Sequence, residues 1–391
     1  MMGAWITRGN GITRGMGQVT SMQGAEDESM GMAAGNRPPG PTAPPRATLH
    51  DAVALEAFRR RWRLDPDRIR RMRYALYHTH ESVTSALARL GDAAAAALPE
   101  SFDLAPLAIA ERHDSSLDGS SKFVLRAADG AKLETVLLRS HTGRTAACVS
   151  TQVGCRAGCP FCATARMGLR RDLSGGEIVE QALVVARIAR DEGRRLRNLV
   201  FMGMGEPLDN ERGLHEAMEC LLGPSGCHFP PRRLLVSTVG VPDAMRRLIE
   251  RFPGVQLALS LHSARPDLRA KLVPWSRKVD WQELREALFY VARQPTVHRH
   301  QGPVMIEHLL LEGVNDGPED AQALIDYLQG IRVHVNLIPY NPVPHAPDWK
   351  PTARSARDVF AQRLRDAGLF TTIRYSMGAD IQAACGQLVQ R

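Results

Sequence analysis

The sequence predicts an α/β fold: a partial (β/α)6 barrel of the TIM type, preceded by a β-hairpin extension and a small N-terminal helical accessory domain. Six short Val- and Leu-rich runs alternate with stretches of helical periodicity, as in parallel strands covered by crossover helices. Six units are too few for a closed eight-stranded barrel. Polar motifs follow these runs directly, at the carboxyl ends of strands, where such folds gather their reactive residues.

Four segments are expected along the 391 residues. Residues 1–46 are rich in Gly, Met, Pro and Ser and predict a disordered leader, with Met30 or Met32 as alternative starts. The other segments are a helical accessory domain (47–115), the barrel with its preceding hairpin (116–375) and a C-terminal tail (376–391).

The accessory segment combines helical periodicity with many arginines. Apolar residues such as Leu55, Phe58 and Trp62 recur at near-helical spacing between residues 47 and 97. Arginines crowd between them: Arg59, Arg60, Arg61, Arg63, Arg68, Arg70, Arg71 and Arg73. These are either the polar faces of two small helices or an electrostatic surface for RNA. The net charge of +8 agrees with the second interpretation.

The elements of the barrel are read from periodicity and capping. The hairpin strands 121–126 and 133–138 flank the turn residues Asp129 and Gly130. The six strands are expected at 146–150, 199–202, 234–238, 257–261, 304–311 and 333–338, and a last strand at 370–375. Helices are expected at 175–190, 211–222, 242–251, 281–294, 318–329 and 355–368; Ser174 and Glu177 form a capping box at the first.

Three of the seven cysteines lie in one loop directly after the first barrel strand. Cys155, Cys159 and Cys162 have the spacing C-x3-C-x2-C within GCRAGCPFCATARMG. A zinc site would need a fourth ligand in register, and none follows; a set of buried structural thiols is the other alternative. Three thiolates leave one corner of a [4Fe-4S] cluster open, and that iron can bind the amino and carboxylate groups of S-adenosylmethionine.

The chain resembles the radical S-adenosylmethionine RNA adenosine methyltransferases of the RlmN/Cfr family over roughly residues 120 to 391. The resemblance rests on ACVSTQVGCRAGCPFC (147–162), VFMGMGEPLDN (200–210), LLVST (234–238), ALSLHSA (258–264), LIPYNPVP (337–344) and DIQAACGQL (380–388). It implies a radical SAM barrel whose cofactors are one [4Fe-4S] cluster and S-adenosylmethionine, two molecules of which are used per turnover.

Cofactor contacts are expected at the ends of the later strands. A carboxylate and close backbone approach at Glu206 and Gly205 suit the cofactor's amino group. By resemblance, S-adenosylmethionine is also contacted by Ser237, Ser260, Leu261, His262 and Asn341. A serine at a strand end is, taken singly, more often a simple cap.

Two cysteines outside the loop carry the specificity of this interpretation. The resemblance implies that Cys385 becomes S-methylated and carries the methyl group, and that Cys148 resolves the protein–RNA adduct through a transient disulfide with Cys385. It also implies that Glu134 accepts a proton from the adenine ring. The alternatives are two ordinary buried thiols and a solvated strand charge.

The expected function is methylation of an adenosine ring carbon, carbon 2, in structured RNA: 23S rRNA, or tRNA. Carbon 8 is the alternative position, a non-catalytic iron–sulfur RNA-binding protein is the alternative class, and a radical enzyme acting on a protein or small molecule is a third. A reductant such as flavodoxin or ferredoxin, a cytoplasmic location and a monomer are expected. No apolar run is long enough to cross a membrane.

Overall fold

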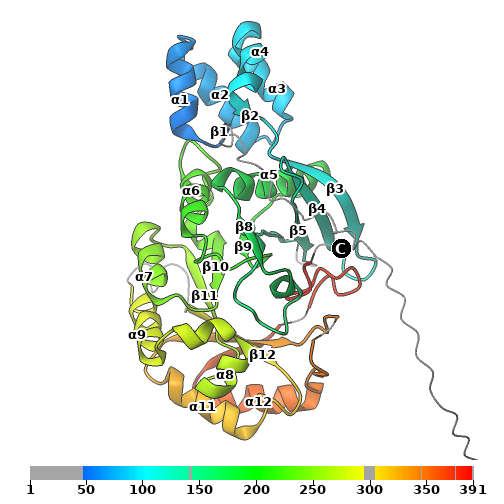
Figure 1. Cartoon of the computed structure of the whole chain (residues 1–391), viewed down its shortest axis with the longest axis vertical. Coiled ribbons are helices and arrows are strands. Elements are labelled where there is room, and N and C mark those ends of the chain that lie inside the picture. The colour runs from blue at the N-terminus through cyan, green and yellow to red at the C-terminus, as the bar shows by residue number, and fades with distance from the viewer. Residues whose placement is uncertain (1–46, 141–142, 295–303, 345, 375, 390–391) are drawn as a thin grey trace, which may run out of the picture. The chain divides into compact units, whose positions relative to one another are not determined.

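A ten-stranded sheet organises the computed structural model, which describes residues 47–140, 143–294, 304–344, 346–374 and 376–389 (Figure 1). Seven neighbouring strands run parallel: β6 (Thr145–Cys148), β9 (Asn198–Phe201), β10 (Leu234–Thr238), β11 (Gln256–Ser260), β12 (Val304–Leu310), β13 (Val333–Pro339) and β14 (Phe370–Ile373). Strands β5 (Lys132–Arg139), β4 (Ser121–Ala127) and β3 (Leu107–Asp114) extend the sheet from β6 in antiparallel order.

The sheet confirms the predicted partial barrel. The six expected strands are β6 and β9 to β13, and the strand expected at 370–375 is β14, which adds a seventh parallel strand beside β13. In the described chain β14 and β3 are the two edges, so the sheet does not close. The predicted hairpin is β4 and β5, joined by the turn at Asp129 and Gly130.

Helices connect the parallel strands, as expected for βαβ units. They are α5 (Gly175–Asp191), α6 (Glu211–Leu222), α7 (Pro242–Arg251), α8 (Pro266–Leu272), α9 (Trp281–Ala292), α11 (Pro318–Leu328) and α12 (Arg354–Asp366). Short 3₁₀ helices are η1 (Ala88–Leu90), η2 (Ala163–Met167), η3 (Pro231–Arg233) and η4 (Pro274–Lys278). None of the helices in the described residues combines the length and apolarity needed to cross a bilayer.

The sequence reading missed three elements near the cysteine loop. Strands β7 (Gln152–Gly154) and β8 (Leu169–Asp172) pair antiparallel on either side of the loop, and helix α8 follows β11. These elements span seven residues or fewer, too short for a periodic pattern to stand out.

The N-terminal part of the described chain is helical. Its elements are β1 (Ala47–Thr48), α1 (Ala52–Arg61), α2 (Pro66–Tyr77), α3 (Val83–Leu87), α4 (Asp92–Ser101) and β2 (Phe102–Asp103). The arginines partly pair with acids on their own helices: Arg59 and Arg60 contact Glu56, and Arg70 and Arg71 contact Asp67. Strand β3, within the segment assigned to the accessory domain, belongs to the large sheet. The expected leader lies outside the described residues.

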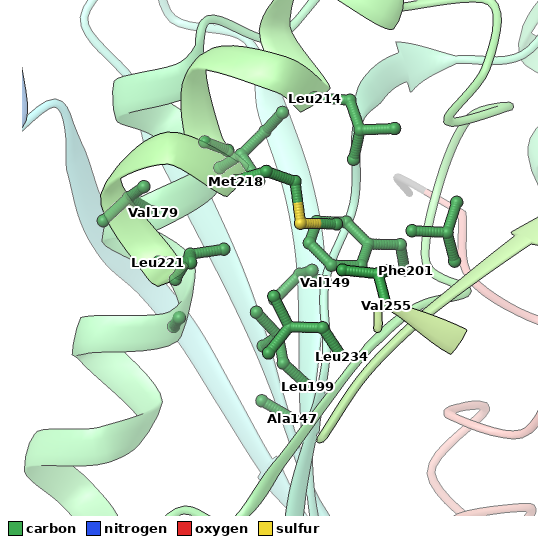
Figure 2. Packing of buried hydrophobic residues seen from close by; sticks show 14 of the residues in the cluster. Ala147, Val149, Val179, Leu199, Phe201, Leu214, Met218, Leu221, Leu234 and Val255 are labelled. Carbon is green, nitrogen blue, oxygen red and sulfur yellow. The ribbon is translucent and has the colours of Figure 1, made fainter. Parts of the chain in front are cut away.

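Apolar side chains hold the first barrel helices against the sheet (Figure 2). Leu214 and Met218 of α6 pack against Phe201 and Leu234 at the ends of two neighbouring strands, and all four are almost fully buried. Each such side chain stabilises the fold by about 1.5–3 kcal/mol relative to an exposed one. This packing fixes the helix layer on which the loops at the carboxyl ends of the strands rest.

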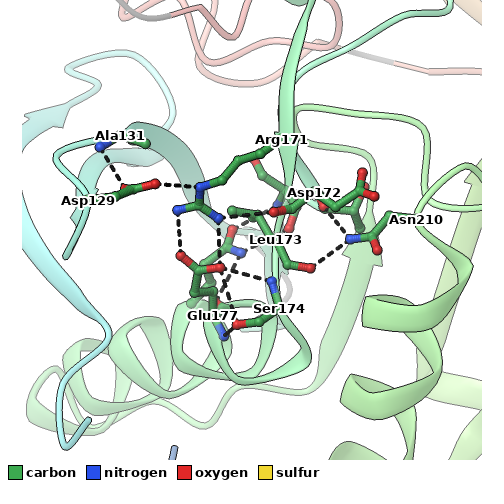
Figure 3. A network of polar contacts seen from close by, with 11 residues as sticks. Asp129, Ala131, Arg171, Asp172, Leu173, Ser174, Glu177 and Asn210 are labelled. Carbon is green, nitrogen blue, oxygen red and sulfur yellow. Dashed lines mark hydrogen bonds and ion pairs between the residues drawn. The ribbon is translucent and has the colours of Figure 1, made fainter. Parts of the chain in front are cut away.

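A polar network fastens strand β8 to its surroundings (Figure 3). The Arg171 guanidinium donates to Asp129 in the hairpin turn at 2.6 Å and to Glu177 in the first turn of α5 at 2.8 Å. Ser174 and Glu177 form the predicted capping box, and Asn210 donates its amide to the Leu173 carbonyl at 2.8 Å. The network joins the base of the cysteine loop to the hairpin and two helices.

Candidate active site

A cavity opens at the carboxyl ends of the parallel strands and brings together most of the predicted site residues. Its lining includes the three loop cysteines and seven of the other predicted residues: Gly205, Glu206, Ser237, Ser260, His262, Asn341 and Cys385. Leu261, Cys148 and Glu134 do not line it. Leu261 is buried, and its backbone N–H donates to the Glu307 carbonyl at 3.1 Å.

The cysteine loop is held in a tight turn between β7 and β8. Gly154 has φ +83°, and a Cβ there would lie 1.8 Å from the Gly168 carbonyl oxygen, so only glycine fits. That carbonyl accepts a hydrogen bond from the Cys155 N–H at 3.0 Å. Burial raises the pKa of the Cys155 thiol to about 12. A bound cation would stabilise the thiolate form of this side chain.

The three thiols suit an iron–sulfur cluster better than a single ion. No group of three or more His, Cys, Asp or Glu side chains within the described residues is placed to hold one metal ion. Zinc gathers its ligands around one point, whereas each cysteine of a four-iron cluster ligates its own corner. The chemistry of Cys155, Cys159 and Cys162 and their shared place in the cavity lining therefore fit the cluster.

Glu206 is a buried carboxylate that lines the cavity. Its Oε1 accepts from the Leu208 N–H at 3.0 Å and its Oε2 from the Val239 N–H at 2.8 Å. Burial raises its pKa to about 7 despite these donors. Gly205 has φ +100°, and a Cβ there would lie 2.6 Å from the Gln152 Cβ. A bound ammonium group would favour the ionised form of this carboxylate.

The remaining predicted contacts come from the next strands. The hydroxyls of Ser237 and Ser260 are hydrogen-bonded to each other at 3.1 Å. His262 is buried, its Nδ1 accepts from the Leu309 N–H at 3.1 Å, and burial lowers its pKa to about 3, so the imidazole is neutral. Phe161 lies edge-on to this ring at 4.8 Å. The wall is thus apolar with a few directed polar groups, as in sites for small cofactors.

Cys385 reaches this cavity from the C-terminal tail. Its carbonyl accepts from the Asn341 amide at 3.2 Å, and the next residue, Gly386, accepts from the Ala163 N–H at 2.7 Å. Cys385 is exposed and also lines a second, smaller cavity, which it shares with Cys148 at the end of β6. Both thiols are free. Desolvation by the surrounding protein raises the pKa of Cys148 to about 12 and, although Cys385 is exposed as a whole residue, raises the pKa of its thiol to about 11.

Comparison with known proteins identifies the family. A model of the radical SAM superfamily matches residues 149–328. A protein of Rhodopirellula baltica named a probable RNA methyltransferase is 43% identical over 349 residues, which is 89% of each chain. A probable dual-specificity RNA methyltransferase RlmN of Symbiobacterium thermophilum is 41% identical over 281 residues, 72% of this chain and 74% of that one. The chain belongs to the RlmN-type radical S-adenosylmethionine RNA methyltransferases.

A solved structure supports the same assignment. The crystal structure of a radical SAM methyltransferase from Sphaerobacter thermophilus superposes with a TM-score of 0.81 at 38% identity, covering 88% of this chain and 99% of that one. Membership makes the chain an enzyme and implies a [4Fe-4S] cluster, S-adenosylmethionine, an RNA substrate and a reductant.

Glu134, the proton acceptor expected from the family resemblance, lies apart from the cofactor cavity. It is 2% exposed, so its alternative interpretation as a solvated strand charge is wrong. Lys122 Nζ lies 3.2 Å from its carboxylate, and the Val389 N–H of the tail donates to it at 2.9 Å. Burial raises the pKa of Glu134, and the Lys122 ammonium opposes that shift. Glu134 lines a separate, polar cavity.

Sequence reasoning missed two charged residues of the family's cofactor cavity. Glu307 of β12 and Arg374, directly after β14, both line it. Arg374 also lines the small cavity of Cys148 and Cys385. A glutamate inside the apolar run VMIEHLLL was the available signal, because a charge in a strand buried on both faces needs a partner. Arg374 follows a short edge strand and gave no comparable signal.

Proposed function

We propose that this enzyme methylates a ring carbon of adenosine, carbon 2, in structured RNA, with 23S rRNA as the favoured substrate and tRNA as a second one. The methyl group passes through S-methylated Cys385, and a transient disulfide with Cys148 releases the product. One observation carries the proposal: Cys385 lines both the cavity of the cluster cysteines and the small cavity of Cys148.

Some residues of the chain would bind the cofactors, and others would react with the transferred methyl group. Cys155, Cys159 and Cys162 would hold the cluster, and Gly205 and Glu206 the amino end of S-adenosylmethionine. When bound, these groups supply a methyl group for transfer and a radical able to take hydrogen from a carbon. The mostly apolar wall excludes water from that chemistry.

Cys385 acts as a nucleophile in this scheme. Its thiol must lose a proton before its sulfur can bond to a methyl carbon. Desolvation by the protein around the thiol raises its pKa to about 11, and the nearby Arg374 guanidinium opposes that shift. Ring carbon 2 of adenine has no nucleophilic lone pair, so a direct polar methyl transfer to it is unavailable. A methyl group carried on the Cys385 sulfur can instead lose a hydrogen atom and add to the ring as a carbon radical.

Release of the product uses the second thiol and the base. Once the carbon borne by Cys385 has bonded to the ring carbon and the adduct has given up one electron to a bound iron–sulfur cluster, Glu134 would take the ring proton by general-base catalysis. Because Glu134 lines the adjacent polar cavity and not the cofactor cavity, the adduct would have to reach it from that side. Cys148 then attacks the Cys385 sulfur: a sulfur–sulfur bond forms, the sulfur–carbon bond breaks, and its electron pair stays on the carbon, which gains a proton to become methyl. Two electrons from an external reductant regenerate both thiols.

Nucleoside mass spectrometry tests the proposal. The reconstituted enzyme is incubated with 23S rRNA fragments and tRNA, S-adenosylmethionine and a reductant, and the RNA is then digested. We expect 2-methyladenosine, and none with Cys385→Ala. A product of 8-methyladenosine would move the reaction to the other ring carbon. Unchanged methylation by Cys385→Ala would rule out the S-methylcysteine route.

A further inference from the structure

Glu307 is a buried carboxylate in the cofactor cavity to which the proposed function gives no role. It lies in the central part of β12, where the strand register places it between Ser260 of β11 and Asn336 of β13. Its side chain lines the cavity, yet the residue is only 2% exposed. A carboxylate is rarely buried this far unless it is paired or hydrogen-bonded.

Within the described part of the chain, only one of the two Glu307 oxygens is satisfied. Oε2 accepts a hydrogen bond from the Asn336 amide at 2.9 Å. Oε1 is buried and has no hydrogen-bond partner among the described residues. Leaving a charged acceptor buried and unpaired is unfavourable, so an oxygen of this kind on a cavity wall points to a ligand that donates to it.

The charges around Glu307 favour a neutral donor over a cation. Arg374 lines the same cavity, and its guanidinium opposes the rise in the pKa of Glu307 that burial causes. A sulfonium placed beside Glu307 would also face that guanidinium and be repelled by it. Glu206, in the loop after β9, is the carboxylate already suited to the cofactor's amino group. With the sulfonium and the amino group excluded, the hydroxyl groups of the cofactor are the donors that fit beside Glu307.

We propose that Glu307 binds the ribose diol of S-adenosylmethionine, with Oε1 accepting from one or both hydroxyls. A carboxylate accepting from ribose hydroxyls is a recurring solution in nucleotide sites. The Ser237–Ser260 hydroxyl pair on the adjacent strands can exchange hydrogen bonds with the same sugar. The proposal rests on cofactor use by this family and not on which RNA carbon is methylated.

Equilibrium binding to the cluster-reconstituted enzyme without RNA tests the assignment. The ligands are S-adenosylmethionine, S-adenosylhomocysteine, which has the same ribose but a neutral sulfur, and the 3′-deoxy and 2′-deoxy analogues of S-adenosylmethionine. We expect Glu307→Gln to weaken the first two equally, about tenfold or more, as loss of a hydrogen bond to a charged group does. At least one deoxy analogue should bind the unmodified enzyme correspondingly weakly and lose little further affinity with the variant.

The control and the contrary outcomes separate the alternatives. Glu312→Gln, an exposed glutamate just beyond the same strand, should leave every affinity unchanged. Weaker binding of S-adenosylmethionine alone would assign Glu307 to the sulfonium, and a loss seen only when RNA is present would assign it to a hydroxyl of the substrate. Each outcome overturns the proposal, as does unchanged binding by Glu307→Gln.

The test remains decisive if the variant fails to fold or loses its cluster. The unmodified enzyme then compares S-adenosylmethionine with both deoxy analogues, and equal affinities for all three overturn the proposal. A variant that binds the cofactor weakly but still forms the same methyladenosine leaves the proposed function intact. If the unmodified enzyme binds the cofactor normally but does not methylate RNA, that result would count against the proposed function and not against the role of Glu307.

Discussion

The buried pair of Lys122 and Glu134 shows how one neighbour determines what a side chain can do. Burial raises the pKa of Glu134, which makes it a stronger base once ionised but disfavours ionisation. The Lys122 ammonium, 3.2 Å away, favours the ionised form that can accept a proton. Lys122 also lies 3.4 Å from the Gln382 carbonyl, so the same cation contacts the tail that carries Cys385.

Replacing Lys122 with methionine should move the pH dependence of product release to higher pH. Without the ammonium, the pKa of Glu134 rises further, and a larger share of the carboxyl is protonated and inactive at neutral pH. Single-turnover formation of methyladenosine across a pH series measures the shift. Lys122→Arg keeps the charge and should restore the original profile. Identical profiles for the methionine variant and the unmodified enzyme would contradict a base tuned by Lys122.

The same substitution changes stability with a defined sign. A carboxyl whose pKa is raised on folding binds protons more tightly when folded, so its stabilising contribution is present below the unfolded pKa and is lost as pH rises through the folded pKa. Lys122→Met should therefore unfold at a lower temperature relative to the unmodified protein as the pH is raised. Thermal unfolding at a series of pH values measures this difference.

Cys148→Ser should arrest the reaction after the carbon bridge between Cys385 and RNA has formed. The hydroxyl is a poor nucleophile toward sulfur, so the sulfur–carbon bond stays intact. A covalent protein–RNA species should accumulate and be visible by denaturing electrophoresis and intact mass. Cys220→Ser, a buried cysteine of the core outside the cavities, is the matched control and should give free product. Free methyladenosine from Cys148→Ser would show that another group resolves the adduct.

Among the secondary-structure elements, the short strand β8 is stabilised by ion pairs to its neighbours. This four-residue strand relies on the Arg171 contacts to Asp129 and Glu177. Arg171→Gln should reduce the free energy of unfolding by about 1–2 kcal/mol, a figure moderated because the side chain is 32% exposed. It should also lower the iron retained per chain, since β8 closes the cysteine loop.

Thermal unfolding and iron content measure the two effects of Arg171→Gln. Arg212→Gln is the matched control: Arg212 is 91% exposed and, among the described residues, pairs only with Glu216 one turn along the same helix. It should change stability by less than about 0.5 kcal/mol. Equal behaviour of the two variants would show that the β8 network does not hold the loop.

For the molecule as a whole, the net charge of +8 predicts binding of RNA that weakens with salt. Even two phosphate contacts reduce affinity about tenfold between about 50 and about 200 mM salt. Fluorescence anisotropy with a labelled RNA hairpin measures the slope. A salt-independent affinity would contradict an electrostatic interface, and equal affinity for unstructured RNA would contradict recognition of a folded substrate.

The tail depends on contacts between residues far apart in the chain. Asp380 accepts from the Ser115 hydroxyl at 2.8 Å, Asp118 accepts from the Gly378 N–H at 2.6 Å, and Thr164 donates to the Leu388 carbonyl at 2.6 Å. Figure 1 shows the tail, in red, close to strand β5. These bonds place Cys385 between the cysteine loop and the hairpin.

The strand and helix order, the cysteine loop and most of the polar side chains that line the cavity could be read from the sequence, because periodicity, capping residues and dense motifs are local. Ser174 and Glu177 marked the start of α5, which was expected at 175–190 and is found at 175–191. The position of Glu134 outside the cofactor cavity, its pairing with Lys122 and the unpaired oxygen of Glu307 are decided only by the tertiary structure. They depend on which strands become neighbours and on burial, and neither quantity is carried by any single stretch of the chain.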